Sequence, residues 1–342
     1  MSSSSSSLPA DEADAIAAAL RDCGLIADDI APRITPLSGG VSCDVYRVDH
    51  GGGTLCVKRA LPTLRVAAVW EAPVERSGYE ILWLRRAREA GIVAPRVLAT
   101  MPDRHMFAME WFEPADHPVW KAELMAGCVD VNFARQVGAA IATIHNATAH
   151  DAATARDFAS DDLFRQLRIS PYLDAIAAVH GDLAPRITAI AARLADTHVA
   201  LVHGDVSPKN ILHGPQGPVF LDAECAWYGD PAFDAAFCLT HLLLKSRVLC
   251  DPALLAAFDA LADVWLGAAR WEDRSGLSSR AASLLAALLL ARVDGKSPAE
   301  YLGDDDREFV RHFARQYLLA PEQEGAGLAM LKRKWSECLE VR

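Results

Sequence analysis

The stretch that decides the fold is Leu201-Val202-His203-Gly204-Asp205-Val206-Ser207-Pro208-Lys209-Asn210-Ile211-Leu212. A second stretch follows it closely and reads Pro218-Val219-Phe220-Leu221-Asp222-Ala223-Glu224. In both, a short apolar run, typical of a buried strand, leads into a polar loop. The two loops together present a carboxylate from Asp205, an amide from Asn210 and a second carboxylate from Asp222.

This set of polar groups is the one that phosphoryl transfer from a nucleotide requires. One carboxylate orients the attacking hydroxyl group, while an amide oxygen and a second carboxylate hold the metal ions that neutralise the phosphates. The spacing His-x-Asp-x4-Asn equals that of the protein-kinase catalytic loop, with Gly204 where those kinases have Arg. We therefore predict Asp205 as the catalytic base, and Asn210 and Asp222 as ligands of Mg²⁺, which prefers oxygen donors.

His203 and Lys209 belong to the same candidate catalytic group. An imidazole two residues before the base usually braces the loop by hydrogen bonds to the backbone, and we favour that role for His203. Lys209 is expected either to neutralise charge on the transferred phosphate or to be an ordinary surface lysine. A similar run, Val179-His180-Gly181-Asp182, has Ile187 where the second copy has Asn210. It is interpreted as a turn between helices.

The first third of the chain combines period-two segments with helical ones. Strands are predicted at 34–37, 41–48, 54–58, 96–100 and 105–112, with His50-Gly51-Gly52-Gly53 as a hairpin turn. Helices are predicted at 11–22 and 74–90, and each is followed by a glycine. These segments predict a five-stranded antiparallel sheet with one inserted helix.

Within this region, Lys58 and Glu80 are predicted to bind a nucleotide. A Lys on the third strand paired with a Glu on the next helix holds the α- and β-phosphates in kinase-type sites. Glu75 is a competing partner on the same helix. Ser38, Gly39 and Gly40 form a small turn whose backbone N–H groups can approach an anion. Further candidates, whose backbone groups would contact an adenine, are Glu110, Trp111 and Phe112.

Beyond Pro114 the pattern is mostly helical, with helices predicted at 131–149, 160–178, 186–197, 231–245, 251–270 and 277–293. The predicted fold class is therefore α+β, with two lobes. A Ser-rich tail at 1–10 precedes a nucleotide-binding lobe at 11–112, and a helical lobe at 113–342 carries the catalytic loop and the substrate site. A linker is expected near Glu110 to Pro114, and ligand sites tend to lie at such boundaries.

The composition is that of a globular protein, with 51% hydrophobic and 23% charged residues. The net charge of −11, from 34 basic and 45 acidic residues, argues against nucleic acid or an anionic membrane as a partner, because both attract basic surfaces. The longest apolar run, at 281–291, is shorter than the roughly 20 residues that span a bilayer. Eight cysteines without a Cys-x-x-Cys pair, and an N-terminus unlike a signal peptide, indicate a cytoplasmic protein with reduced thiols.

The phosphate acceptor is predicted to be a small molecule that carries a hydroxyl group. Glu224, Trp227 and Asp230 follow the second loop and are candidate substrate-binding residues, through contacts with a cation. Core packing is the alternative for Trp227. Asp234 opens an apolar helix and is expected to cap it and to accept hydrogen bonds from the catalytic loop. The loop at 291–298 either reaches the cleft or faces solvent, and the chain is expected to be a monomer or a homodimer.

Together these residues resemble the aminoglycoside phosphotransferase and choline kinase superfamily, which has a protein-kinase-like fold. The similarity runs from about residue 34 to about residue 315. Its most specific parts are the two stretches quoted above, and Tyr79-Glu80-Ile81-Leu82 and Gly229-Asp230-Pro231-Ala232-Phe233-Asp234 support it. The resemblance implies ATP, or GTP in some members, with Mg²⁺ as cofactor. It implies transfer of the γ-phosphate to an amino alcohol, a sugar or an aminoglycoside-like molecule.

By the same resemblance, Asp205 is the base, Asn210 and Asp222 are metal ligands, and Lys58 with Glu80 is the phosphate clamp. Two alternatives stay open. One is a kinase-like nucleotide-binding regulator with little catalysis, although every polar position expected of an active kinase is filled. The other is a protein kinase, although no Ala-Pro-Glu segment or long activation loop follows Asp222.

Overall fold

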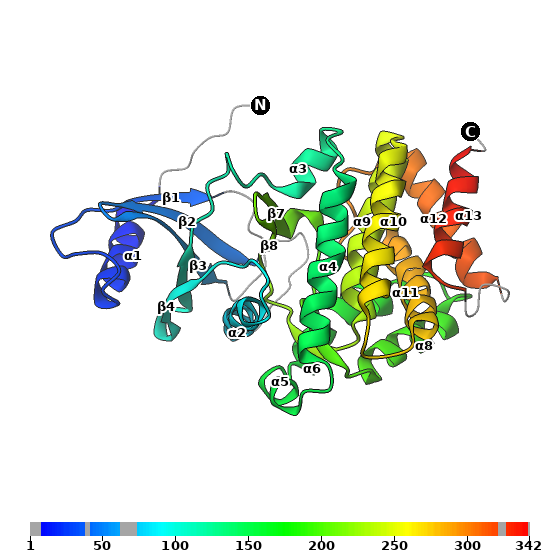
Figure 1. The fold of residues 1–342 in the computed structure, drawn as a ribbon, viewed down its shortest axis with the longest axis horizontal. Helices are drawn as coiled ribbons and strands as arrows, with labels where there is room; N and C mark the ends of the chain where they lie inside the picture. Colours follow the sequence, from blue (N-terminus) through cyan, green and yellow to red (C-terminus); the bar gives the residue numbers. More distant parts are fainter. Residues whose placement is uncertain (1–7, 38–41, 62–73, 321–325, 341–342) are drawn as a thin grey trace.

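The computed structural model describes residues 8–37, 42–61, 74–320 and 326–340. A lobe built around a β-sheet lies at one end of the molecule and a larger helical lobe at the other (Figure 1). The hairpin of β7 (Ile211–Gly214) and β8 (Gly217–Phe220) lies between them. The predicted α+β architecture with two lobes is confirmed.

Five antiparallel strands form the sheet of the first lobe, in the order β1-β2-β3-β5-β4, as predicted. Strands β2 and β3 form a hairpin in which His50 pairs with Gly53, so Gly51 and Gly52 make the two-residue turn. The strands are β1 (Arg33–Leu37), β2 (Cys43–His50), β3 (Gly53–Ala60), β4 (Val97–Met101) and β5 (Met106–Glu110), with a short 3-10 turn η1 (Pro102–Arg104) before β5.

Helices α1 (Ala10–Asp22) and α2 (Arg76–Glu89) pack on opposite faces of this sheet. Successive side chains of a strand point to opposite faces. Leu55 and Val57 of β3 accordingly belong to the core around α1, whereas Cys56 belongs to the core that contains Trp83 of α2. Lys58, two residues after Cys56, therefore lies on the face that α2 and the second lobe cover.

The second lobe is helical, and its buried core continues into α2. One predicted helix, 160–178, is present but changes type. It begins as α6 at residues 161–164, continues as a π-helical segment η2 (Arg165–Asp174) and ends as α7 at residues 175–179. Pro171 inside η2 has no N–H to donate, which accounts for the wider turn there. The helices are α3 (Trp120–Met125), α4 (Val131–Thr148), α5 (Ala152–Asp157), α6 (Asp161–Phe164), α7 (Ala175–Val179), α8 (Ala184–Asp196), α9 (Ala232–Leu249), α10 (Pro252–Ala268), α11 (Arg274–Asp294), α12 (Asp304–Leu319) and α13 (Leu328–Glu340).

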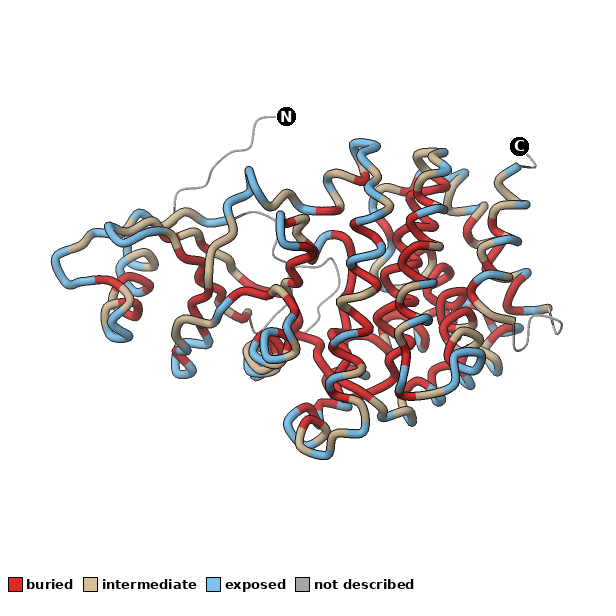
Figure 2. Tube along the Cα trace, in the orientation of Figure 1, coloured by how far each residue is buried: buried red, intermediate tan, exposed pale blue. Residues whose placement is uncertain are grey.

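The most deeply buried helices are α9 and α11, at the centre of this lobe (Figure 2). Within the described ranges, α11 alone is long and apolar enough to cross a membrane, but 72% of its apolar window is buried inside the protein. Because α9 and α12 pack against it, α11 has the character of a core helix.

Short strands carry the two polar loops singled out in the sequence. The apolar run before His203 forms β6 (Ala200–Val202), and the run before Asp222 forms β8. Their antiparallel partners, β9 (Trp227–Gly229) and β7, were not predicted. A 3-10 turn η3 (Pro208–Asn210) connects the first loop to β7. The similar run at 180–182 is a turn between α7 and α8, as predicted, with Asp182 bound to Arg315.

Candidate active site

Asp234, in the first turn of α9, holds the loop that contains Asp205. Its two carboxylate oxygens accept hydrogen bonds from the backbone N–H groups of His203 (2.8 Å) and Gly204 (2.9 Å). The side chain is only 1% exposed. Buried N–H groups need such partners, and a carboxylate is a strong one. Asp234 therefore accepts hydrogen bonds from this loop, as predicted. The expectation that it also caps α9 is wrong, because its oxygens are taken up by the loop and the N–H of Ala232 donates to Asp230 instead.

Gly204 explains why this loop lacks the Arg of protein kinases. Its φ of +80° lies in the left-handed region, and a Cβ atom built there would lie 2.4 Å from the carbonyl oxygen of Cys225. Its own carbonyl oxygen accepts a hydrogen bond from Nε of Arg168 at 2.5 Å. The loop can therefore approach the 222–226 segment closely only with glycine at this position.

We expect Gly204→Ala to lower the free energy of unfolding by at least about 2 kcal/mol. Two costs add up: an Ala residue is strained in the left-handed conformation, and its Cβ atom clashes with the backbone of Cys225. Urea denaturation would measure this. Gly181→Ala is the matched control in the similar run, since a Cβ atom there meets nothing within 4 Å. Equal stability of the two variants would contradict the close approach of the loops.

Asp205 is 6% exposed and carries two cationic neighbours. One of its carboxylate oxygens lies 3.0 Å from Nη2 of Arg168 and 3.4 Å from Nζ of Lys209. Burial by itself raises the pKa of Asp205, but the charges of Lys209 and Arg168 outweigh it, so the pKa lies below its ordinary value. Asp205 is therefore a carboxylate at neutral pH, and it can accept a hydrogen bond from a hydroxyl group.

His203 joins the two polar loops. Its Nδ1 accepts a hydrogen bond from the N–H of Asp205 (3.1 Å), and its Nε2 lies 3.1 Å from the carbonyl oxygen of Leu221. Burial lowers the pKa of His203, which favours the neutral ring that this pattern requires. Trp83 of α2 packs edge-on against the ring at 4.6 Å. These contacts support the bracing role of His203.

Asp222 and Asn210 lie in the same part of the structure as Asp205. The side-chain amide N–H of Asn210 donates to the backbone carbonyl oxygen of Asp205 (3.2 Å), and the backbone carbonyl oxygen of Asn210 accepts from the N–H of Leu221 (2.9 Å). Asp222 has a φ of +65°, a conformation that Asp tolerates better than most residues. Burial raises its pKa, but Lys58 and Lys209 oppose this, and the pKa lies well below its ordinary value.

The oxygen atoms of Asn210 and Asp222 form a donor set that suits Mg²⁺. Within the described ranges no three His, Cys, Asp or Glu residues converge as a metal site. Mg²⁺ in nucleotide enzymes commonly takes one or two protein ligands and completes its shell with phosphate oxygens and water. The residues present therefore fit a magnesium–nucleotide complex better than a protein-only metal centre.

Lys58 links the first lobe to the second loop. Its Nζ lies 2.7 and 2.9 Å from the two carboxylate oxygens of Glu80, and it also contacts the carboxylate of Asp222. Lys58 is 5% and Glu80 1% exposed. Burial lowers the pKa of Lys58, but Asp222 and Glu80 more than reverse this, so the ammonium is held in its charged form. The structure thus pairs Lys58 with Glu80 and not with Glu75.

The remaining nucleotide-binding candidates are placed as follows. Ser38, Gly39 and Gly40 lie outside the described residues. Glu110 ends β5, and Trp111 and Phe112 continue into the connection between the lobes. The indole N–H of Trp111 donates to Glu113 at 3.0 Å, and the ring of Phe112 meets His117 edge-on. Residues 111–119 connect β5 to α3, and the boundary between the lobes near residues 110–114 stays a prediction.

The three substrate candidates are buried, and each is bound by another protein group. Glu224 forms an ion pair with Arg76 of α2 at 2.9 Å, because the left-handed turn at Asp222 sends it away from the direction an extended chain would take. Asp230 forms a two-point ion pair with Arg280 of α11. Trp227 stacks on Phe164 with ring centroids 4.2 Å apart, and its N–H donates to Asp161. These contacts support structural roles, and the packing alternative for Trp227 in particular.

Sequence reasoning missed Arg168, which contacts both Gly204 and Asp205. It lies 37 positions before Asp205 in a segment with other arginines, and no local pattern distinguishes it. Only the π-helical course of η2 brings it against the loop of Asp205. Arg76 was missed for the same reason: its partner Glu224 is 148 positions away.

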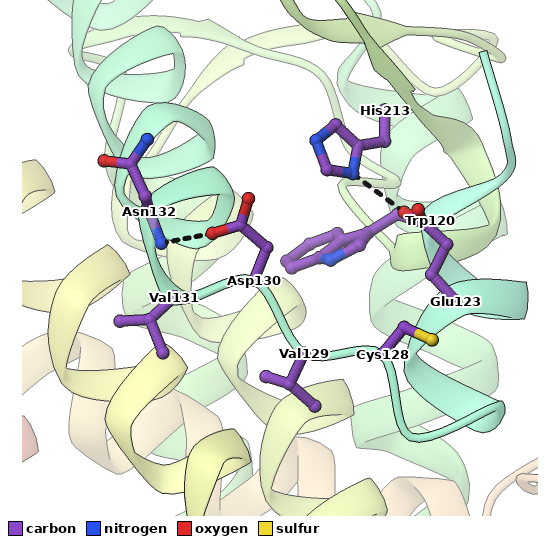
Figure 3. A pocket seen from close by; sticks show the side chains of 8 residues that line it. All are labelled: Trp120, Glu123, Cys128, Val129, Asp130, Val131, Asn132 and His213. Atoms are coloured by element: carbon purple, nitrogen blue, oxygen red, sulfur yellow. Dashed lines mark hydrogen bonds and ion pairs between the residues drawn. The ribbon is translucent and has the colours of Figure 1, made fainter. Parts of the chain in front are cut away.

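A surface pocket of about 460 Å³ lies apart from this group, beside α3 and the start of α4 (Figure 3). Its titratable groups are already engaged: His213 lies 2.9 Å from Glu123, and Asp130 accepts hydrogen bonds from the first N–H groups of α4. Asp205, Asn210, Asp222, Lys58 and Glu80 do not line it. It therefore offers no catalytic set of its own.

Comparison with known proteins agrees with this geometry. The profile of the phosphotransferase enzyme family matches residues 33–273. A methylthioribose kinase of Escherichia coli O45:K1 is 28% identical over 244 residues, which cover 62% of this chain and 57% of that enzyme. The chain thus matches less than two thirds of the length of this relative.

Two solved structures share the fold at low sequence identity. A choline/ethanolamine kinase family protein from Mesorhizobium loti gives a TM-score of 0.55 at 16% identity, covering 93% of this chain and 99% of that one. An amicoumacin kinase, solved with AMP-PNP, Ca²⁺ and its ligand Ami, gives 0.55 at 13% identity and covers 96% of each chain. Both support a protein-kinase-like arrangement of the two lobes.

Proposed function

The chain belongs to the phosphotransferase enzyme family, and on that premise we propose that it is a kinase that transfers the γ-phosphate of ATP to a hydroxyl group of a small molecule. Mg²⁺ is the proposed cofactor. The observation that carries the proposal is the position of Lys58, which contacts Glu80 of the first lobe and Asp222 of the second at the same time. This is the arrangement in which kinase-type sites hold nucleotide phosphates.

Each residue of the group has a role in this proposal. Lys58, positioned by Glu80, binds the α- and β-phosphates, and Asn210 and Asp222 hold Mg²⁺. The bound ion supplies positive charge beside the phosphates. Asp205 accepts a hydrogen bond from the acceptor hydroxyl and directs its oxygen toward the γ-phosphorus. Because the transition state is loose, the proton moves late, and a carboxylate of low pKa suffices.

Lys209 and Arg168 act on Asp205 from two sides. Lys209 is largely exposed, and its ammonium can also approach the transferred phosphate. Arg168 is buried and binds the Gly204 carbonyl, so it positions the loop. Both cations keep Asp205 ionised when substrate excludes water. The filled and paired polar positions argue against a regulator without catalysis.

A screen of hydroxyl compounds for ATP consumption tests this function. The panel should contain amino alcohols, pentoses including methylthioribose, sugar acids and aminoglycosides, each with ATP and with GTP. We expect turnover with at least one class, and loss of that turnover on chelation of divalent metal with recovery on adding Mg²⁺. A nucleotide that binds without any phosphate transfer across the panel would favour the regulatory alternative. The cytoplasmic location and the monomer or homodimer state stay predictions.

A further inference from the structure

Lys245 of α9 is a buried lysine without an acidic partner. It is 0% exposed, and no Asp or Glu in the described ranges forms an ion pair with it. Its Nζ lies 3.5 Å from the hydroxyl oxygen of Tyr301 and 4.7 Å from the centre of that ring. Burying an ammonium costs free energy unless it is paired. Burial accordingly lowers the pKa of Lys245 to about 7.

The neighbours of Lys245 add positive charge. Lys121 of α3 lies 5.8 Å from the Tyr301 ring and binds Glu300, an exposed carboxylate. Arg292 of α11 is 9% exposed; its Nη1 donates to Ser297, and its Nε is buried without a hydrogen-bond partner in the described structure. We call Lys121, Lys245 and Arg292 the cationic cluster. Lys121 and Lys245 both face the ring of Tyr301, and the charge of Arg292 is near enough to lower the pKa of Lys245.

The segment that follows α11 contributes two residues that contact this cluster, Glu300 and Tyr301. The sequence left open whether the loop at 291–298 reaches the cleft or faces solvent. Arg292 joins the cluster from the end of α11, and Glu300 and Tyr301, just after the loop, contact α3 and α9. His241 of α9 also faces Tyr301, with its Nδ1 3.4 Å from the hydroxyl oxygen.

A continuous row of side chains connects this cluster to Asp205. The guanidinium of Arg168, which contacts Asp205, lies 5.9 Å from the ring of Phe237. The ring of Phe237 lies 5.5 Å from that of His241, one turn before Lys245. Asp234, Phe237, His241 and Lys245 follow one another at intervals of three or four residues, so they share a face of α9.

The separation along α9 suits a small acceptor. Asp234, which holds the catalytic loop, is 11 residues before Lys245, or about 16 Å along the axis at 1.5 Å per residue. Helical side chains lean toward the N-terminus, which brings the ammonium back toward the loop. Burial lowers the pKa of His241, and the positive charges of Lys245, Arg292 and Lys209 lower it further. One face of α9 therefore connects the cluster to the loop of Asp205.

We propose that the phosphate acceptor carries an anionic group, a carboxylate or a phosphate, that binds the cationic cluster around Lys245 while its hydroxyl group lies at Asp205. This inference rests on the proposed kinase function and specifies the substrate class. A buried charge without a counter-ion is costly for a protein, and proteins accept such a loss of stability at functional sites. Amino alcohols and aminoglycosides would meet like charge here, and the acidic residues first considered for a cation, Glu224 and Asp230, are already paired with arginines.

The test compares matched acceptors that differ in one charged group. D-glycerate and glycerol, D-ribonate and ribitol, and ribose 5-phosphate and ribose are assayed by coupled ATP consumption, beside ethanolamine and an aminoglycoside. We expect an anionic member to exceed its neutral counterpart by at least about tenfold in kcat/KM, the scale of one charged hydrogen bond. The carboxylate and phosphate pairs distinguish the two possible anions.

Lys245→Met removes the charge and keeps most of the volume. We expect kcat/KM for the anionic acceptor to fall about 10- to 100-fold, mainly through KM, while the melting temperature rises or stays equal, because a buried unpaired charge is lost. A purely structural lysine would give the opposite change in melting temperature. Lys332→Met is the control: it removes a lysine of α13 that is paired with Asp259 of α10, and it should change neither value appreciably.

Two outcomes would overturn the inference, and they are distinguishable from failure of the kinase proposal. If neutral or cationic acceptors are phosphorylated as well as the acids, and Lys245→Met changes nothing, the kinase stands and the anionic acceptor does not. If no compound supports turnover, binding decides: D-glycerate and inorganic phosphate should raise the melting temperature of the wild type more than that of Lys245→Met. Equal shifts would reject the anionic site.

Discussion

Replacing Asp205 by Ala should lower turnover by at least about 100-fold, the scale of general-base catalysis, with ATP binding largely retained. The reason is local: Asp205 is the carboxylate that the loop, Arg168 and Lys209 hold in charged form. Initial-rate kinetics with the best acceptor from the screen would measure the loss, and ATP titration followed by tryptophan fluorescence would measure binding.

Two companion variants make this result specific. Asp205→Asn keeps the shape of the side chain and should be nearly as inactive, which separates the charge from the packing. Asp182→Ala, in the similar run His180-Gly181-Asp182, removes an exposed ion pair with Arg315 and should leave the rate within about twofold. A comparable loss of rate in Asp182→Ala would show that the base lies in the run at 180–182 and not in the loop of Asp205.

Replacing Lys58 by Met should lower the free energy of unfolding by about 3–5 kcal/mol and weaken ATP binding strongly. Breaking a buried pair from one side leaves an uncompensated charge, and here the stranded group is Glu80, which is 1% exposed. The double variant Lys58→Met/Glu80→Gln should recover most of the stability but none of the activity. Guanidinium denaturation of both variants, beside ATP titration, checks this.

The stability lost in Lys58→Met should depend on pH with a definite sign. Burial already raises the pKa of Glu80 to about 7, and loss of Lys58 removes the charge that opposes this rise. A carboxyl group whose pKa is higher in the folded than in the unfolded state binds more protons when folded, so stability decreases as pH rises. The difference from wild type should therefore be larger at pH 8 than at pH 5.5. A difference that grows on acidification would rule out Glu80 as its source.

Much of the site could be predicted because its residues are close in sequence. Asp205 and Asn210 are five positions apart, and apolar strand residues precede both Asp205 and Asp222. Such spacing determines local structure: β6 and β8 form, and each delivers its polar residue at a strand end. The hairpin β2–β3 and the order of the helices follow from local turn and periodicity signals in the same way.

The substrate side could not be predicted, because it consists of contacts between residues far apart in the chain. The sequence does not show that the three substrate candidates have partners. In the folded protein Glu224 pairs with Arg76, and Asp230 pairs with Arg280. Trp227 stacks on Phe164. The sequence pattern does not reveal that a partner 50 to 148 positions away neutralises a carboxylate.

The amino-acid sequence by itself determined the two-lobed fold, the proposed catalytic loop and the proposed phosphate-binding pair, since these depend on periodicity and short spacing. Only the tertiary structure decided which charges are paired and which are left over. Packing of α3 and α9 places Lys121 and Lys245 on the ring of Tyr301, and packing of α11 brings the charge of Arg292 near enough to lower the pKa of Lys245. Electrostatic free energy depends on distance and burial, and neither quantity exists before the helices pack.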